Sequence, residues 1–320
     1  MKRSGMNITK KFLVAAATLS LTACIPQEQP STAIQKAIPT SEQVSIKLPG
    51  GQDRTIGQLA EFYVTTRGIT ATFNGGSAWV LVLIHTIVQF PVTTVAGNQY
   101  TWGPFSDALD PAEYKLDVVD NGDETYAWTL SGKSKLDANA EFEAIISGVS
   151  DASPGENLGN GNFLIDFDAG KRVNPIDADP EARGQVSVTY DLAERALALH
   201  IMTTDDLGAP VQADYAYQEG ADGSGDMVFG IEGDMGGGAE LEQALIRSRW
   251  IASGEGRADV ALKGGNTENP AGVLASECWD GQFKRSFFAV LAGDNSGVFG
   301  AAEGSETNCA FAEADMPDAP

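Results

Sequence analysis

Acidic side chains are the most abundant chemical groups of this chain. Its 320 residues include 44 Asp and Glu against 21 Lys and Arg and two His, a formal net charge of −23 at pH 7. Paired carboxylates hydrolyse glycosides, and clustered carboxylates bind calcium. The closest acids are Asp166 with Asp168 and Asp177 with Asp179, which share a face in extended chain, and the turn clusters Asp120, Asp123 and Glu124, and Asp222 with Asp226.

None of these groups has the twelve-residue pattern of an EF-hand loop, and chance clusters are expected among 44 acids. The two histidines, His85 and His200, lie in apolar segments, so a histidine-ligated metal or a Ser-His-Asp triad has little to draw on. The GxSxG, P-loop, HExxH and CxxC motifs do not occur. We therefore assign no catalytic residue, no metal ligand and no cofactor.

Arginines gather near the C-terminal end of the chain. Arg247 and Arg249 alternate with Ile246, Ser248 and Trp250, so both should point to the face of a strand opposite Trp250, and Arg257 follows on the next strand. One interpretation is a cross-strand surface of ion pairs. The other is a patch that docks an acidic partner or the phosphate of a lipopolysaccharide.

The elements that position these residues change along the chain. Between Thr55 and Phe90 apolar residues recur at steps of three and four, and Thr55 with Gln58 fits a capping box, so residues 51–92 are predicted to form a helical hairpin. Its second half, residues 78–90, is apolar nearly all round and too short to span a membrane. His85 and Gln89 there, with Trp128, could line a cavity for an apolar ligand, or form a hydrogen-bonded edge of the core.

From Gln99 onward apolar residues alternate with polar ones, which is typical of strands with one buried face. The clearest sets are Tyr126/Trp128/Leu130, Phe142/Ala144/Ile146, Val186/Val188/Tyr190, Leu197/Leu199/Ile201, Met227/Phe229/Ile231 and Ala258/Val260/Leu262. Short turn signals such as Asn121-Gly122 and Asp280-Gly281 separate them. Residues 93–309 are therefore predicted to form an antiparallel domain of about a dozen strands.

A sheet of that length must coil, close or split. We expect a mainly β (α+β) fold in which a long curved antiparallel sheet or half-barrel packs on the helical hairpin. A β-sandwich is the alternative.

The first 24 residues carry the only specific motif. Four basic residues and an apolar run precede Leu21-Thr22-Ala23-Cys24, which resembles the lipobox of bacterial lipoproteins. The resemblance implies that residues 1–23 are a signal peptide, that Cys24 is acylated, and that the membrane is a partner through this anchor. Ile25 stands where an Asp would retain the protein at the inner membrane, so the outer membrane is favoured. An ordinary secretory signal with an incidental cysteine is the alternative.

Residues 24–50 are then a flexible tether, and residues 310–320 an acidic tail that we expect to fray. Removing residues 1–23 deletes four cations and no acids, so the formal charge falls from −23 to −27. Such a body is repelled by nucleic acid, so we expect no nucleic-acid partner. If Cys24 is acylated, Cys278 and Cys309 remain as one pair outside the cytoplasm, where a disulfide persists. Two unpaired thiols are the alternative.

Three segments of the body, NGGSAWV at 74–80, TWGPF at 101–105 and SECWD at 276–280, resemble a group of uncharacterised lipoproteins from large-genome bacteria such as myxobacteria. That resemblance implies no known activity. We expect a cell-envelope lipoprotein with a non-enzymatic binding or structural role, whose partner is an apolar ligand or a protein. A carboxylate-based hydrolase acting on envelope or extracellular glycans is the alternative.

Overall fold

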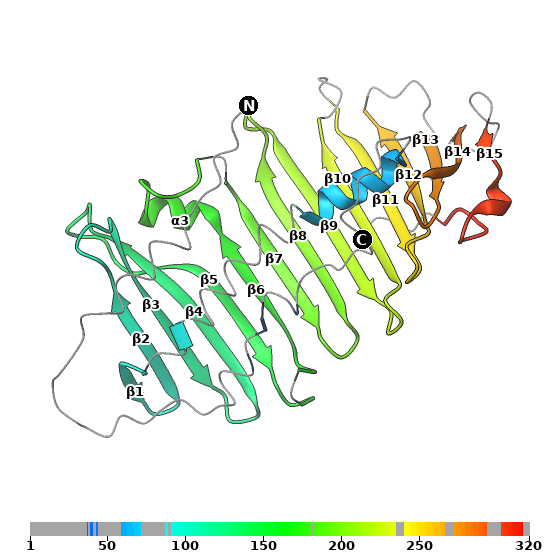
Figure 1. Cartoon of the computed structure of the whole chain (residues 1–320). Coiled ribbons are helices and arrows are strands. Elements are labelled where there is room, and N and C mark those ends of the chain that lie inside the picture. The colour runs from blue at the N-terminus through cyan, green and yellow to red at the C-terminus, as the bar shows by residue number, and fades with distance from the viewer. Residues whose placement is uncertain are drawn as a thin grey trace.

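A single antiparallel meander dominates the computed structural model of this chain (Figure 1). Every strand pairs with the strands before and after it in the sequence, as expected when short turns join consecutive strands. The structure describes residues 37, 39, 40, 43, 59–71, 87, 88, 91–155, 157–180, 182–234, 240–265, 272–292 and 302–315.

The described residues contain an α-helix over residues 61–71, and after it fifteen strands, one short α-helix and one 3-10 helix. They are β1 (Thr94–Ala96), β2 (Gln99–Phe105), β3 (Ala112–Asp120), β4 (Thr125–Ser134), β5 (Glu143–Asp151), β6 (Asn160–Asp166), α3 (Phe167–Val173), β7 (Gln185–Asp191), β8 (Ala196–Thr204), β9 (Pro210–Glu219), β10 (Gly225–Gly233), β11 (Glu242–Trp250), β12 (Gly256–Gly264), β13 (Val273–Trp279), β14 (Arg285–Ala292), β15 (Glu303–Gly304) and η3 (Glu306–Asn308).

The fifteen strands form one open, curved sheet, which confirms the predicted fold class. The alternative of a β-sandwich is wrong, because all described strands belong to the same hydrogen-bonded sheet. The sheet ends in very short strands: β1 has three residues and β15 has two. Short edge strands offer little unpaired backbone to another chain.

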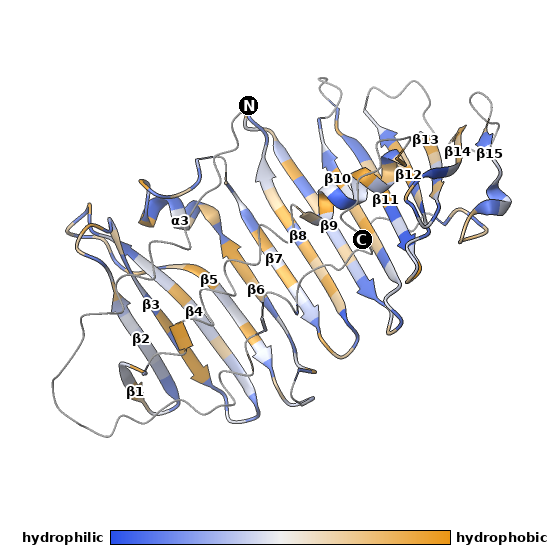
Figure 2. Ribbon diagram, in the orientation of Figure 1, coloured by the Kyte–Doolittle hydropathy of each residue, from blue (hydrophilic) through white to orange (hydrophobic). Residues whose placement is uncertain are grey.

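The two faces of the sheet differ in polarity, and the alternating colours of Figure 2 follow this difference along the strands. One face, here called the core face, carries the buried Trp102, Trp128, Trp250 and Trp279. The other, here called the solvent face, carries Arg247 and Arg249, as the alternation with Trp250 predicted. Period-2 alternation sorts the side chains because successive residues of a strand point to opposite faces.

The predicted set Phe142/Ala144/Ile146 is the one that fails. A register shift opposite Leu130 and Ser131 leaves one extra residue, Ile145, in β5, and Ile145 and Ile146 are both buried as a result. Ala144 is exposed, and the Phe142 ring lies beneath the amino groups of Lys115 and Lys133. One extra residue in a strand shifts the alternation, so each residue before it points to the opposite face of the sheet from the one predicted.

Aromatic rings cover glycines on the core face. Directly paired residues in neighbouring strands place Trp128 opposite Gly148, Trp250 opposite Gly225, Trp279 opposite Gly256 and Tyr190 opposite Gly161. A Cβ atom added to Gly148 would lie 2.5 Å from the Trp128 ring, and one added to Gly256 would lie 2.3 Å from the Trp279 ring. Because these glycines have no side chain, the large aromatic rings of the neighbouring strands pack directly over their backbone.

A helix over residues 61–71 crosses the core face at the C-terminal end of the sheet (Figure 1). Tyr63 stacks on Phe283 at 4.4 Å between ring centroids and also contacts Trp279. Farther along the helix, Thr66 shares a 2.6 Å hydrogen bond with Ser248 of β11. The first half of the predicted hairpin is thus a helix packed on the sheet.

The second half of the hairpin, residues 78–90, lies outside the described residues except for 87 and 88, which are helical. Thr55 and Gln58 of the predicted capping box also lie outside them.

Candidate functional site

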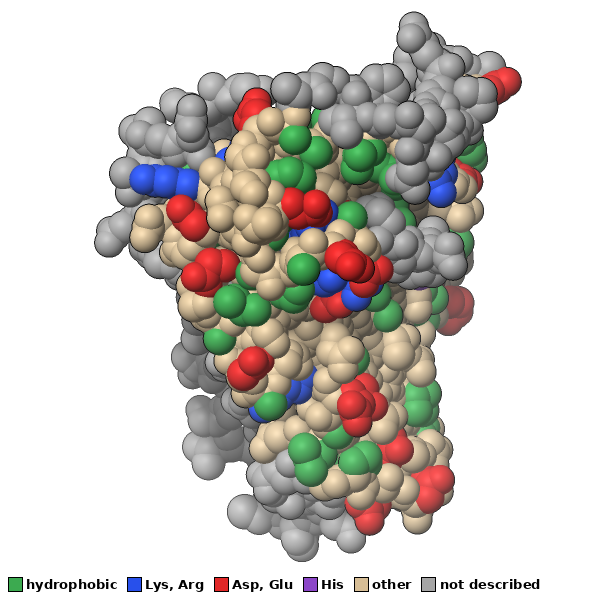
Figure 3. Space-filling model, turned by 90° about the vertical axis from the view of Figure 1, so that its right-hand side faces the viewer, with side chains coloured by type: hydrophobic (Ala, Val, Ile, Leu, Met, Phe, Trp, Pro, Cys, Tyr) green, Lys and Arg blue, Asp and Glu red, His purple; other side chains and the backbone are tan. Residues whose placement is uncertain are grey.

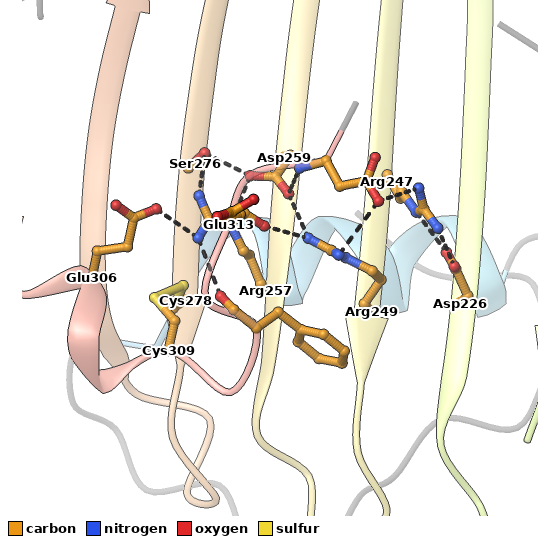
Figure 4. Close-up of polar contacts among 12 residues, drawn as sticks. Asp226, Arg247, Arg249, Arg257, Asp259, Ser276, Cys278, Glu306, Cys309 and Glu313 are labelled. Atoms are coloured by element: carbon orange, nitrogen blue, oxygen red, sulfur yellow. Dashed lines mark hydrogen bonds and ion pairs between the residues drawn. A yellow bond between two sulfur atoms is a disulfide. The ribbon is translucent and has the colours of Figure 1, made fainter. Parts of the chain in front are cut away.

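The arginines singled out from the sequence form one cluster on the solvent face, with carboxylates between them (Figure 4). Register explains the grouping: Arg249 pairs with Arg257 across β11 and β12, and Arg247 pairs with Asp259. On the far side of β11, Arg249 pairs with Asp226 of β10. Directly paired residues have Cβ atoms about 5 Å apart, so their charged groups meet. We call Asp226, Arg247, Arg249, Arg257, Asp259 and Ser276 the arginine cluster.

The centre of the cluster is a buried ion pair. Arg257 and Asp259 are each 1% exposed, and Arg257 Nε donates to Asp259 Oδ1 at 2.9 Å. Ser276 Oγ donates to the same carboxylate at 2.6 Å and accepts from Arg257 Nη2 at 3.1 Å. Because a charge this deep is costly unless it is paired and hydrogen-bonded, these contacts are what allow both groups to lie inside.

The second cluster arginine, Arg247, is held by Asp226. Its Nε donates to Asp226 Oδ1 at 3.0 Å and its Nη2 to Asp226 Oδ2 at 2.5 Å, a bidentate pair. This hydrogen bonding raises the pKa of Arg247 above its ordinary value, against a smaller opposing effect of burial. Arg249 lies between Arg247 and Arg257. Its Nη2 is 3.2 Å from Asp259 Oδ2, and its buried Nε has no hydrogen-bond partner.

The C-terminal end of the described chain lies across this cluster. Arg257 Nη1 donates to Glu306 at 2.7 Å and to the Phe311 carbonyl at 3.2 Å, and Arg249 Nη2 donates to the Glu313 carbonyl at 2.9 Å. Asp315 pairs with Arg247 Nη1 at 2.9 Å. The expectation that the tail frays from residue 310 is therefore wrong for residues 311–315, because their oxygens complement the arginines.

A disulfide fixes this arrangement. Cys278 and Cys309 are bonded, which confirms the predicted pairing and rules out the alternative of two free thiols in this structure. Cys278 is the cross-strand neighbour of Arg257, so the bond brings Cys309 to the edge of the cluster. Phe311, two residues on, has its ring 4.9 Å from the Arg249 guanidinium.

Guanidinium groups stay protonated and only donate hydrogen bonds. The cluster can therefore bind carboxylates and carbonyl oxygens, but its arginines cannot serve as acid, base or nucleophile at neutral pH.

Beside the cluster, the solvent face is hollowed into a shallow depression of about 390 Å³ over β7 to β11. Its floor is formed by Ala196, Ala198, Ala216 and Val228, with Asp191 at one end and Arg247 at the other. The floor is apolar because small side chains of β8 and β9 face it.

The acidic pairs noted in the sequence hold turns and caps. Asp166 accepts from the Ala169 amide at 2.8 Å as the N-cap of α3, and Asp222 accepts from Ser224 in the turn before β10. The expectation that Asp166 and Asp168 share a face of extended chain is wrong, because Asp168 lies in α3. Burial acts to raise the pKa of Asp166, but the hydrogen bonds from Ala169 and Gln185 together lower it below its ordinary value.

Of the three proposed ligand-cavity residues, only Trp128 lies within the described residues. His85 and Gln89 lie outside the described residues. Trp128 is buried, donates from Nε1 to Ser150 Oγ at 3.1 Å and packs on Phe163, so both its edge and one side are occupied by the protein itself. His200 lies on the solvent face, where its Nδ1 is 2.6 Å from Asp214.

Within the described residues, no group of three or more His, Cys, Asp or Glu side chains is placed to hold a metal ion. No helix in that part of the chain is long and apolar enough to cross a bilayer. Comparison with protein-family models, curated proteins and solved structures finds no match to this chain.

Sequence reasoning missed the C-terminal partners of the cluster, Glu306 and Asp315. The signal was present: an acidic stretch follows Cys309, and Cys309 was already expected to pair with a strand adjoining Arg257. Placing the tail by that bond would have brought opposite charges together.

Proposed function

We propose that this chain is a lipid-anchored protein of the bacterial outer membrane that binds a protein partner through the solvent face of its sheet without catalysing a reaction. The main support for the proposal is the Cys278–Cys309 disulfide. If Cys24 is acylated, Cys278 and Cys309 are the two remaining cysteines of the chain, and they are bonded to each other. Disulfides persist outside the cytoplasm, and lipobox-type processing takes place there.

The binding role is supported by the shape and chemistry of the solvent face. It offers a shallow apolar depression that is bordered by Arg247 of the arginine cluster. Protein interfaces combine an apolar centre with polar groups and are enriched in arginine. Trp128 and the other core-face tryptophans are packed inside the protein, so an apolar ligand on that face has less support.

The alternative of a glycan hydrolase has little to support it. Asp191 and Asp226 border the same depression but stand three strands apart, which is about 14 Å at the usual strand spacing. Glycosidase carboxylates lie about 5 to 9.5 Å apart. Asp226 is also neutralised by Arg247.

Labelling with radioactive palmitate in a bacterial host tests the anchor. We expect the wild-type chain to incorporate label and to fractionate with the outer membrane, and Cys24→Ser to incorporate none, because the acylated thiol is absent. The matched control replaces both other cysteines, Cys278→Ser with Cys309→Ser, and should label like the wild type. Label retained by Cys24→Ser would contradict the proposal.

A further inference from the structure

The C-terminal segment, residues 305–315, occupies the arginine cluster in the manner of a bound peptide. It contributes two carboxylates, from Glu306 and Asp315, and two backbone carbonyls, from Phe311 and Glu313, each of them to an arginine of the sheet. In return, the Asp315 amide donates to Asp259 at 3.2 Å. Carboxylates at the two ends of the segment and carbonyls between them contact the arginines, and the chain between them consists of η3 and a bent stretch, so the cluster recognises a bent acidic segment.

The segment more than neutralises the positive charge that the sheet leaves over. The cluster itself holds three guanidinium groups and two carboxylates, a net charge of +1, and Glu306 and Asp315 of the segment bring this to −1. Even then Arg249 Nε stays buried without a hydrogen-bond partner. Figure 3, viewed from the β15 end of the sheet, shows that acidic side chains are spread over this end, with basic ones among them.

Few buried contacts hold the segment in place. The side chains of Glu306 and Asp315 are 47% and 52% exposed, and most residues from 302 to 315 are exposed. Ion pairs this exposed are individually weak. Pairing of β15 with β14 holds the start of the segment, and the disulfide ties Cys309 to the strand beside Arg257, which keeps the local concentration of the rest of the segment high.

We propose that the arginine cluster is a binding site for an acidic peptide of a protein partner, that residues 305–315 fill it in cis, and that reduction of the Cys278–Cys309 disulfide opens it to a partner in trans. A dithiol reductant supplies two electrons and two protons: the sulfur–sulfur bond breaks, two thiols form, and the reductant's thiols become a disulfide. This inference deepens the proposed function and rests on it for the partner.

Fluorescence anisotropy with the full chain tests the inference. The probe is a labelled peptide with the sequence of residues 305–315 and serine in the cysteine position. We expect binding about tenfold tighter after dithiothreitol treatment than before it, because the released segment competes less well. A second route leaves the disulfide intact: Glu306→Gln with Asp315→Asn weakens the cis contacts and should also tighten peptide binding several-fold.

Three controls make the outcome decisive. A peptide with Gln and Asn in place of its acids should bind at least tenfold more weakly, and Arg247→Gln with Arg249→Gln should remove the difference between the two peptides. Equal affinity for oxidised and reduced protein, or no binding to either the reduced protein or the Glu306→Gln, Asp315→Asn variant, would overturn the inference.

Displacement of the peptide by inorganic phosphate, but not by sodium chloride of the same ionic strength, would assign the site to phosphate and overturn it too. Loss of peptide binding with palmitate labelling intact would refute this inference alone and leave the anchor standing.

Discussion

At the scale of single residues, buried charge decides how the helix over residues 61–71 joins the sheet. Glu277 of β13 has no exposed surface, yet its carboxylate accepts from the backbone amides of Glu61 and Phe62 at the start of that helix. It also accepts from Arg285 Nε at 2.6 Å. A carboxylate at a helix N-terminus satisfies unpaired amides and complements the helix dipole.

We predict that Glu277→Gln lowers the free energy of unfolding by about 3 kcal/mol, because it leaves Arg285 without its buried counter-charge. Burial acts to lower the pKa of Arg285, but the hydrogen bond and charge of Glu277, together with Glu303 and Glu61, raise it above its ordinary value. Urea denaturation measures the loss. The matched control is Glu303→Gln: Glu303 lies 3.3 Å from the same arginine but is 65% exposed, so its loss should stay below about 1 kcal/mol. Equal losses would contradict this account of Glu277.

Residue-level sequence reasoning was most useful for the cysteines and arginines. The disulfide followed from counting, and the common face of Arg247 and Arg249 followed from their spacing around Ser248. The buried partners Asp259 and Ser276 could not be predicted, because they depend on the register between β11, β12 and β13.

At the scale of elements, the pairing of a large aromatic ring with a glycine on the next strand recurs along the core face. A glycine interrupts a strand because it has no side chain to pack, and a ring laid over it restores the lost contact. Each such pair therefore fixes the local register as well as filling the core.

We predict that Gly148→Ala lowers the free energy of unfolding by about 1 to 3 kcal/mol, since its Cβ would lie 2.5 Å from the Trp128 ring and 2.6 Å from the Asn162 carbonyl. Gly68→Ala is the matched control, because a Cβ there has no atom within 4 Å on a helical backbone. It should stabilise the protein by about 0.5 to 1 kcal/mol. Chemical denaturation of the two variants compares them, and a stable Gly148→Ala protein would contradict the close fit of ring and glycine.

Strand faces were predictable because the period of two survives wherever the pairing is regular, as in Tyr126/Trp128/Leu130. The bulge in β5 could not be predicted, since nothing in the residue types marks the extra position. The short helix α3 was missed as well: seven residues including a glycine carry too little periodicity.

At the scale of the whole molecule, the order of the strands follows from the sequence but the form of the sheet does not. Short turns such as Asn121-Gly122 dictate that neighbours in sequence pair, and all fifteen described strands obey this. Whether so long a sheet splits into a sandwich or stays open depends on twist summed over every pair. Local patterns do not indicate the return of the C-terminal segment onto the solvent face, but the pairing of Cys278 with Cys309 does.

The proposed location in the cell envelope accounts for features near both ends of the chain, because the proposed lipid at Cys24 and the disulfide at Cys309 both form outside the cytoplasm. The intact mass of the native protein tests this most directly. We predict a chain that begins at Cys24, carries the added mass of fatty acyl groups and gains the mass of two hydrogens on reduction. A native chain that keeps residues 1–23, or one that begins at Cys24 with no lipid, would contradict it.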